Sequence, residues 1–263
     1  MPTVQFNTRE LMEMLGGGAT VDVLRQRIPM LGVDLVSIDD DLLDMEVFPN
    51  RPDMLSVEGF ARALKGFLEI EKGLVDCKTS ESGIVFKLDS SVKSVRPFAA
   101  AAAAYDVSIT GDFLVSIMGV QEKLHTTHGR NRVKVAIGIH DLDKVQSPFT
   151  YKAVRPDEVS FVPLDMSEEM NLSEILRRHP KGRDYAFTLE GSELYPVIVD
   201  KNGSVLSFPP IINGELTRVS EETTNLLIEV TGKSGLAVNQ ALNIIASAFA
   251  DRGGKIASVE IKN

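Results

Sequence analysis

The stretch VLSFPPIINGELTRV at residues 205–219, together with LIEVTG at residues 227–232, decides the fold. Its first part is typical of a strand that ends at the Pro209–Pro210 pair, and Asn213–Gly214 is typical of a turn. Its second part is typical of a strand that carries one acid, Glu229, among leucine, isoleucine and valine. The stretch therefore predicts two strands joined by an irregular connection.

Glu229 has two possible orientations. The side chains of a strand alternate between its faces, so the acid either points to solvent or lies in a pocket with polar partners. The neighbourhood favours the pocket, because the two prolines remove backbone donors and force an irregular path beside short polar side chains. These are Ser207, Asn213 and Thr231. We expect the stretch to form the rim of a small-molecule pocket.

Periodicity places further elements on either side of this stretch. We expect strands at 84–88, 149–154, 185–189, 195–200, 204–208 and 256–261, a hairpin at Asn202–Gly203, a short helix capped by Asn171 with Glu174, and a helix over 238–249 that ends at Gly253–Gly254. The alanine run 99–104 has helix propensity, but Arg96–Pro97 before it favours a buried strand. A helix over 112–125 then precedes a strand over 133–139.

The first 75 residues have the pattern of a small α/β unit. Asn7 and Thr20 are expected to cap helices, residues 35–38 and 43–48 to form a hairpin, and residues 57–68 a helix whose start is capped by the turn at 50–53. We predict a mixed α/β (α+β) protein with a small N-terminal α/β domain at residues 1–75 and a larger mixed-sheet domain at residues 83–263.

Composition limits the function. The 263 residues are 43% hydrophobic and 25% charged, which is typical of a globular protein, and no window is apolar enough for a membrane span. We expect a cytoplasmic protein without a membrane contact. The net charge of −9 argues against wholesale wrapping of nucleic acid. Cys77 is the single cysteine and cannot form an internal disulfide.

Several chemistries lack their motifs. The chain has no G-x-S-x-G nucleophile elbow, and the glycines at 16–18 lack the Lys-Ser/Thr of a P-loop. The spacing of His125, His128, His140, Asp141 and Asp143 only weakly suggests a metal site, so we predict no metal. The segment 125–132 is the only concentrated basic patch that we expect. It is either a solvated loop or a contact for the unstacked 3′ end of an RNA.

These residues resemble a known family. SFPPIINGELTRVS and IEVTG are similar to the amino-acid editing (B3/B4) domain of the β subunit of archaeal and eukaryotic phenylalanyl-tRNA synthetases. The similarity extends to FPNRPD at 48–53, QEKL at 121–124 and AIGIHDLD at 136–143. It covers nearly the whole chain and implies an N-terminal part of such a subunit.

The resemblance implies hydrolysis of tyrosine wrongly esterified to tRNA(Phe) by attack of water on the aminoacyl ester. It places Gln121, Glu122, Arg132 and Asn213 at the reaction, Ile198, Ser207, Pro210, Glu229, Thr231 and His140 around the amino acid, and His125, Arg130 and Arg132 at the RNA. Whether Glu122 is a base or only a hydrogen-bond partner stays open. Leucine can occur in related domains where Ile198 stands, and several archaeal relatives carry Asp where Glu229 stands.

The resemblance also implies partners. It predicts the 3′ end of tRNA(Phe) as substrate and an α subunit that forms a heterotetramer with the full-length β subunit. It implies no cofactor for editing, because Mg²⁺ and ATP belong to the synthetase reaction of the full complex. The alternatives are a non-catalytic module for tRNA docking or subunit assembly, and an unrelated small-molecule binding domain whose acid recognises an amine.

Overall fold

The computed structural model describes residues 2–263. It begins with a three-stranded antiparallel sheet in the order β1-β3-β2. The elements of this N-terminal unit are β1 (Thr3–Asn7), α1 (Thr8–Met14), α2 (Val21–Arg27), η1 (Ile28–Leu31), β2 (Asp34–Ile38), β3 (Leu42–Glu46), η2 (Pro52–Leu55) and α3 (Val57–Phe67).

The caps of this unit follow from local sequence. Asn7 and Thr20 accept the backbone N–H groups of Glu10 and Val23 and so begin α1 and α2, as predicted. The cap of α3 was predicted wrongly, because Ser56 caps it by accepting from the Gly59 N–H, and the turn before it starts the short helix η2 instead. Strand β1 was not predicted.

A nine-stranded mixed sheet forms the rest of the molecule, in the order β12-β11-β10-β7-β4-β14-β5-β13-β6. Its pairs are antiparallel except β14 with β4 and β4 with β7. The strands are β4 (Ser80–Leu88), β5 (Phe98–Tyr105), β6 (Val135–Asp141), β7 (Phe149–Val154), β10 (Tyr195–Val199), β11 (Val205–Phe208), β12 (Ile212–Asn213), β13 (Leu226–Gly232) and β14 (Lys255–Lys262).

Helices and short elements complete this part. They are η3 (Ser90–Ser94), α4 (Gly111–Thr126), η4 (Leu142–Lys144), α5 (Leu172–Arg178), α6 (Pro180–Tyr185), η5 (Ala186–Leu189), η6 (Glu215–Thr217) and α7 (Gly235–Asp251), with a two-stranded pair β8 (Ser160–Phe161) and β9 (Met170–Asn171). The mixed α/β class is confirmed. The bounds 1–75 and 83–263 stay a prediction, because one hydrophobic core runs from the N-terminal unit into α4 and α7.

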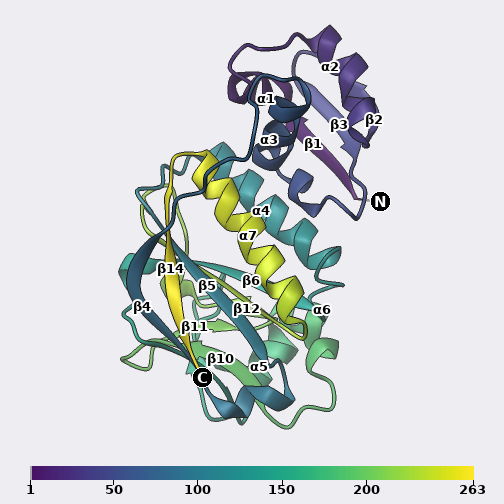
Figure 1. The fold of residues 1–263 in the computed structure, drawn as a ribbon. Helices are drawn as coiled ribbons and strands as arrows, with labels where there is room; N and C mark the ends of the chain where they lie inside the picture. The colour runs from purple at the N-terminus through teal and green to yellow at the C-terminus, as the bar shows by residue number, and fades with distance from the viewer. Residues whose placement is uncertain (1) are drawn as a thin grey trace.

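The alanine run is a central strand, as predicted. Strand β5 lies between β14 and β13 in the sheet. Ala100, Ala102 and Ala104 belong to the core that contains α7, and Ala101 and Ala103 to the core on the opposite face. Helices α4 and α7 lie side by side across the sheet, below the N-terminal unit (Figure 1). Small side chains on both faces let helix and strands approach closely.

The segment 185–189 was predicted as a strand and is instead the end of α6 and the turn η5. Pro180 occupies the first turn of α6, where its fixed φ suits a helix. The His179 side chain accepts from the Lys181 N–H and caps it. Helix α5 ends at Arg178, directly before this cap, so the two short helices form a continuous pair. The capping box predicted for α5 at Asn171 and Glu174 is present.

The outer strands of the large sheet, β12 and β6, face each other. Asn213 on β12 donates its Nδ2–H to the Ile139 carbonyl on β6 over 3.4 Å. Directly after β12, Thr217 lies with its Oγ1 at 2.8 Å from Nδ1 of His140 on β6. The sheet therefore curls until its two edges meet at a seam that side chains bridge.

A partly buried charge cluster joins the N-terminal unit to the end of α7. Arg252 contacts Glu58 of α3 and Glu10 of α1, both at 2.5 Å, and its guanidinium lies 4.1 Å from the Phe113 ring centroid. The Glu58 side chain is almost fully enclosed, so Arg252 is the cation that compensates its charge. A second pair, Arg62 with Asp251, bridges the same two parts.

We predict that Arg252→Met lowers the free energy of unfolding by about 3 kcal/mol, because it leaves the Glu58 carboxylate buried without a cation. Urea denaturation measures this loss. The double variant Arg252→Met with Glu58→Leu should recover most of it, because an apolar pair replaces the charges. A double variant no more stable than the single one would contradict this account.

Candidate functional site

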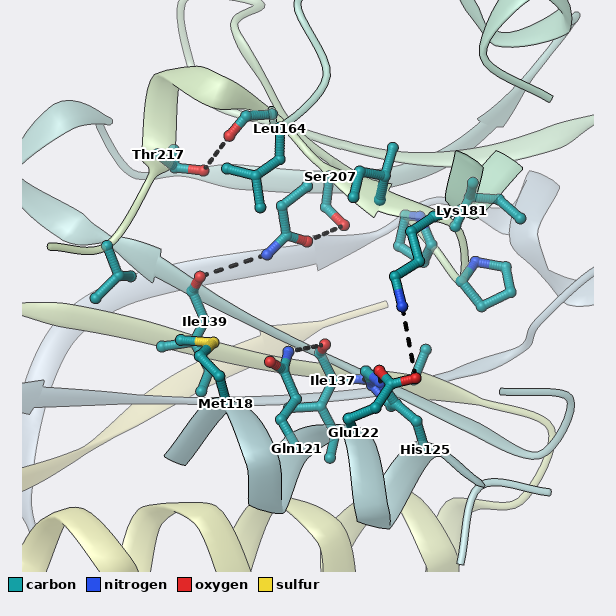
Figure 2. Close-up of a pocket in the computed structure, with 18 of the residues that line it drawn as sticks. Met118, Gln121, Glu122, His125, Ile137, Ile139, Leu164, Lys181, Ser207 and Thr217 are labelled. Carbon is teal, nitrogen blue, oxygen red and sulfur yellow. Dashed lines mark hydrogen bonds and ion pairs between the residues drawn. The ribbon is translucent and has the colours of Figure 1, made fainter. Parts of the chain in front are cut away.

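A pocket of about 360 Å³ opens along the seam, within the range of small-molecule sites. Helix α4 and strand β6 form one side and the β11–β12 connection the other (Figure 2). The predicted site residues that line it are Gln121, Glu122, His125, Arg132, Ser207, Pro210, Asn213 and Glu229. Apolar lining comes from α4, β6, the β8–β9 and β11–β12 connections and the segment after η6, including Leu114, Met118, Ile139, Leu164, Ile211 and Val219.

The free edge of β6 organises the polar side chains. Strand β6 pairs with β13 on one side only, so alternate residues direct their N–H and C=O groups outward. Gln121 donates its Nε2–H to the Ile137 carbonyl at 2.7 Å, and His125 Nε2 accepts from the Ile137 N–H at 2.8 Å. Asn213 reaches the next outward carbonyl, that of Ile139. Three predicted site residues thus form hydrogen bonds with the backbone groups at the free edge of β6.

His125 and Glu122 are neighbours of opposite character. Because His125 Nε2 accepts a hydrogen bond, the neutral ring carries its proton on Nδ1, which lies 3.5 Å from Glu122 Oε2. Burial lowers the pKa of His125 to about 4. The contact with His125, with the charges of Arg132 and Lys181, holds the pKa of Glu122 well below its usual range. At neutral pH the pair is therefore a neutral imidazole beside an ionised carboxylate.

Arg132 is largely enclosed rather than a solvated loop charge, and its predicted roles at the ester and the RNA stay predictions. Only 8% of the residue is exposed. It donates to the Pro210 and Ile211 carbonyls at 3.3 and 2.9 Å and to Glu122 Oε2 at 2.8 Å, and its guanidinium lies 4.2 Å from the Tyr185 ring centroid. It ties the β11–β12 connection to α4 across the pocket, so its removal would also disturb the structure.

The loop that carries Arg132 has an uncommon backbone. Arg130, Asn131 and Arg132 have φ values of 51°, 51° and 66°, in the left-handed region that costs side-chain-bearing residues free energy. Fully buried Arg96 holds the loop by donating to the carbonyls of Arg132 at 3.0 Å and Val133 at 3.1 Å. It also donates to the Thr231 carbonyl on β13 at 2.9 Å. Sequence reasoning missed this role, because a single Arg before Pro97 carries no pattern.

Glu229 lies in the pocket wall and not toward solvent. The residue is 2% exposed, its Oε1 is 3.8 Å from His140 Nε2, and its Oε2 has no hydrogen-bond partner among the described residues. Gly138 lies opposite it on β6, and a Cβ there would be 2.4 Å from Glu229 Oε1. The glycine therefore makes room for a buried carboxylate with an unused acceptor, an arrangement that is costly without a ligand.

The other predicted residues occupy varied places. Ser207 donates its Oγ–H to Asn213 Oδ1 at 3.2 Å, opposite α4 (Figure 2). Ile198, Thr231 and His140 are fully buried and do not line the pocket in residues 2–263, although His140 contacts Glu229. Arg130 is exposed and also outside the lining. The roles of these residues in binding stay predictions.

Sequence reasoning missed several neighbours of the pocket. Lys181 lines it with Nζ at 3.6 Å from Glu122 Oε1, and the Tyr185 O–H donates to the same oxygen at 3.0 Å. Both belong to α6, part of which was predicted as a strand. The prediction of only one concentrated basic patch also overlooked the segment RRHPKGR at 177–183. Its alternation of basic residues with His179 and Pro180 was the signal available.

The described part of the chain offers neither a metal site nor a membrane-spanning helix. No group of three or more His, Cys, Asp or Glu side chains within residues 2–263 could hold a metal ion. None of the helices described there combines the length and apolar character needed to cross a bilayer.

Known proteins are similar to this chain in sequence and fold. A family model described as the B3/4 domain matches residues 116–259. Phenylalanine–tRNA ligase β subunits of Archaeoglobus fulgidus and Methanococcoides burtonii are 51% and 48% identical over 99% of this chain. The chain spans about half the length of these curated relatives, 47% and 48%.

A solved structure is also similar. It is the crystal structure of an N-terminal fragment of the phenylalanyl-tRNA synthetase β subunit from Pyrococcus horikoshii. The match has a TM-score of 0.92 and 37% sequence identity, and it covers 99% of this chain and 76% of that one.

The pKa of His125 predicts how stability depends on pH. Unfolded histidine takes up a proton near pH 6.5, whereas folded His125 does so near pH 4, so the unfolded chain binds more protons between these values. The contribution of neutral His125 to the free energy of unfolding should be fully present above pH 6.5. It should be lost on acidification toward pH 4, a fall of up to about 3 kcal/mol.

Urea denaturation of the wild type and of His125→Gln at several pH values measures this dependence. Glutamine can still accept from the Ile137 N–H but does not titrate, so the fall between pH 6.5 and 4 should be smaller in the variant. The same fall in both proteins would contradict the assignment.

Proposed function

The chain belongs to the family of phenylalanine–tRNA ligase β subunits and carries their B3/4 domain, and from this premise we propose that its pocket edits tRNA(Phe). The reaction is hydrolysis of tyrosine that has been wrongly esterified to the 3′ end of tRNA(Phe). Water attacks the ester carbonyl, the ester bond breaks, and free tyrosine and uncharged tRNA leave.

The unused acceptor of Glu229 carries this proposal. Tyrosine and phenylalanine differ by one phenolic hydroxyl, and an apolar pocket would scarcely separate them. A buried carboxylate oxygen without a partner accepts the phenolic O–H and stays unpaired when phenylalanine binds. Sites that hydrogen-bond a substrate hydroxyl reject the analogue that lacks it by roughly 10⁴-fold.

Gln121 is the best-placed group to orient the attacking water. Its Nε2 is engaged by the Ile137 carbonyl, which leaves its Oε1 free to accept from a water in the pocket. An aminoacyl ester is already activated, so holding water and ester in register supplies much of the rate enhancement. Asn213, anchored to Ile139 and Ser207, would hold the ester from the opposite side.

Glu122 and His125 are better suited to holding the pocket wall in place than to transferring a proton. A general base works best when its pKa is near the working pH, and both groups have pKa values well below neutrality. Glu122 also receives hydrogen bonds from Arg132 and Tyr185. We therefore assign Glu122 to hydrogen bonding that fixes the pocket wall, the second of the two roles left open by the sequence.

The names of the relatives extend the proposal to partners. A subunit called β works beside another subunit, so we propose that the full-length protein assembles with an α chain and acts on tRNA(Phe) in the cytoplasm. Aminoacylation itself, with ATP and Mg²⁺, is proposed for that full complex and not for this pocket.

Deacylation of Tyr-tRNA(Phe), with Phe-tRNA(Phe) as the competing ester, tests the function. We expect the chain to release tyrosine in multiple turnovers and to spare phenylalanine. Glu229→Ala should slow tyrosine release by about 100-fold or more and reduce the preference between the esters. Glu260→Ala, which removes an exposed acid of β14, is the matched control and should behave as the wild type.

The outcomes separate the alternatives. Binding of tRNA without turnover would favour a docking or assembly module and contradict editing. Turnover with unchanged selectivity in Glu229→Ala would support hydrolysis but reject Glu229 as the group that recognises tyrosine. Circular dichroism confirms that each variant is folded.

A further inference from the structure

We propose that a surface beside the pocket mouth, formed by α6 and η5, binds the single-stranded 3′ end of the RNA whose ester enters the pocket. The inference rests on the proposed function, because it concerns the same substrate. We call this surface the α6 rim and define it by Lys181, Arg183, Tyr185 and Phe187.

The need for such a surface follows from Arg132. This cation was expected to hold RNA, but its hydrogen bonds to two carbonyls and to Glu122 leave it enclosed. A protein with a net charge of −9 repels phosphates unless cations gather locally. The RNA therefore requires exposed cations close to the pocket, and the α6 rim supplies them.

Charges on the α6 rim are available to a ligand. Arg183 is exposed and forms no ion pair within residues 2–263, and the same holds for Arg177 on α5. Lys181 lines the pocket, where its only carboxylate contact in the described chain is Glu122 at 3.6 Å. Arg130 on the neighbouring loop is also exposed. Phosphates leading into the pocket would meet these groups in turn.

Two aromatic rings lie beside the pocket-lining residues Glu122 and Arg132. The Tyr185 ring is held by Arg132 against one face and by its hydroxyl bond to Glu122. The Phe187 ring lies next to it, with centroids 6.5 Å apart and an interplanar angle of 39°. Phe187 is 50% exposed although phenylalanine is usually buried. Exposed rings beside cations are the combination by which proteins bind unstacked bases of single strands.

The backbone of the α6 rim is held by contacts to neighbouring segments. His179 caps α6 through the Lys181 N–H and is itself fixed by the Leu164 carbonyl at 3.0 Å. Gly182 packs directly on α5, since a Cβ there would be 1.9 Å from the Ile175 carbonyl oxygen. The side chains of the rim therefore project from a backbone that is tied to both the pocket and α5.

The geometry gives the RNA a direction. An ester that reaches Glu229 and Gln121 would place its terminal ribose near Glu122 and Lys181, which line the pocket and have partly exposed side chains. The Tyr185 hydroxyl donates to Glu122, and the half-exposed Phe187 ring adjoins the Tyr185 ring. The last unpaired bases would therefore stack on Phe187 while Lys181 and Arg183 contact their phosphates.

Fluorescence anisotropy with two RNA hairpins tests this surface. One hairpin ends in an unpaired 3′ CCA, and the other is blunt and otherwise identical. We expect tighter binding of the overhang, and about tenfold weaker binding of it by Phe187→Ala, because one stacked base is lost. Phe48→Ala, which removes a ring exposed to 38% in the N-terminal unit, is the matched control and should bind as the wild type.

Salt dependence tests the cations. Arg183→Ala should lower the slope of log K against log salt by roughly 0.7, the value for one contact to a single strand. Lys72→Ala removes an exposed cation of the N-terminal region and should leave the slope unchanged. Equal binding of the two hairpins by the wild type, no binding of either, or wild-type behaviour of both rim variants would overturn the proposal.

These assays do not depend on catalysis. If the wild type binds the overhang through Phe187 but releases no tyrosine, the α6 rim is supported and the editing function fails. If it releases tyrosine and Phe187→Ala leaves both KM and hairpin affinity unchanged, the editing function is supported and the α6 rim is rejected. A raised KM at constant kcat would support both.

Discussion

The open edge of β6 is the constraint on which the site depends. An edge strand presents backbone N–H and C=O groups that need partners once they are enclosed. Here Gln121, His125 and Asn213 supply them from α4 and β12. The same hydrogen bonds fix the side chains whose remaining polar atoms face the pocket. The hydrogen bonds that satisfy the edge of β6 therefore also build the pocket, which lies at the seam between β12 and β6.

Three buried charged residues lie around the pocket, and they differ in how their charges are compensated. Arg96 and Arg132 are held by backbone carbonyls, and the loop that carries Arg132 has a left-handed backbone that the contacts of Arg96 maintain. Glu229 is different, because one of its oxygens has no partner among the described residues. An enclosed acceptor of this kind is stabilised when a donor arrives. The proposed tyrosine hydroxyl is such a donor.

Local features of the sequence predicted local structure well, but they did not predict contacts between residues that are distant in the sequence. The strand at 98–105 followed from the flanking Arg-Pro pair, and the caps at Asn7, Thr20 and Asn171 from side-chain chemistry. Eight site residues named from the motifs line one pocket.

The errors share a cause. The segment 185–189 has strand-like composition, but the start of α6 at Pro180 and the hydrogen bond of Tyr185 to Glu122 determine its path. Arg132 was expected at the surface because the sequence does not reveal that its loop packs on residues 210 and 211. The curl that joins β12 to β6 depends on the register of nine strands, which no local pattern encodes.

The most direct test of the account is the affinity of two adenosine amides, one carrying tyrosine and one phenylalanine in place of the hydrolysable ester, measured by calorimetry. The account predicts that the tyrosyl compound binds at least about 100-fold more tightly, and equal affinities would contradict it.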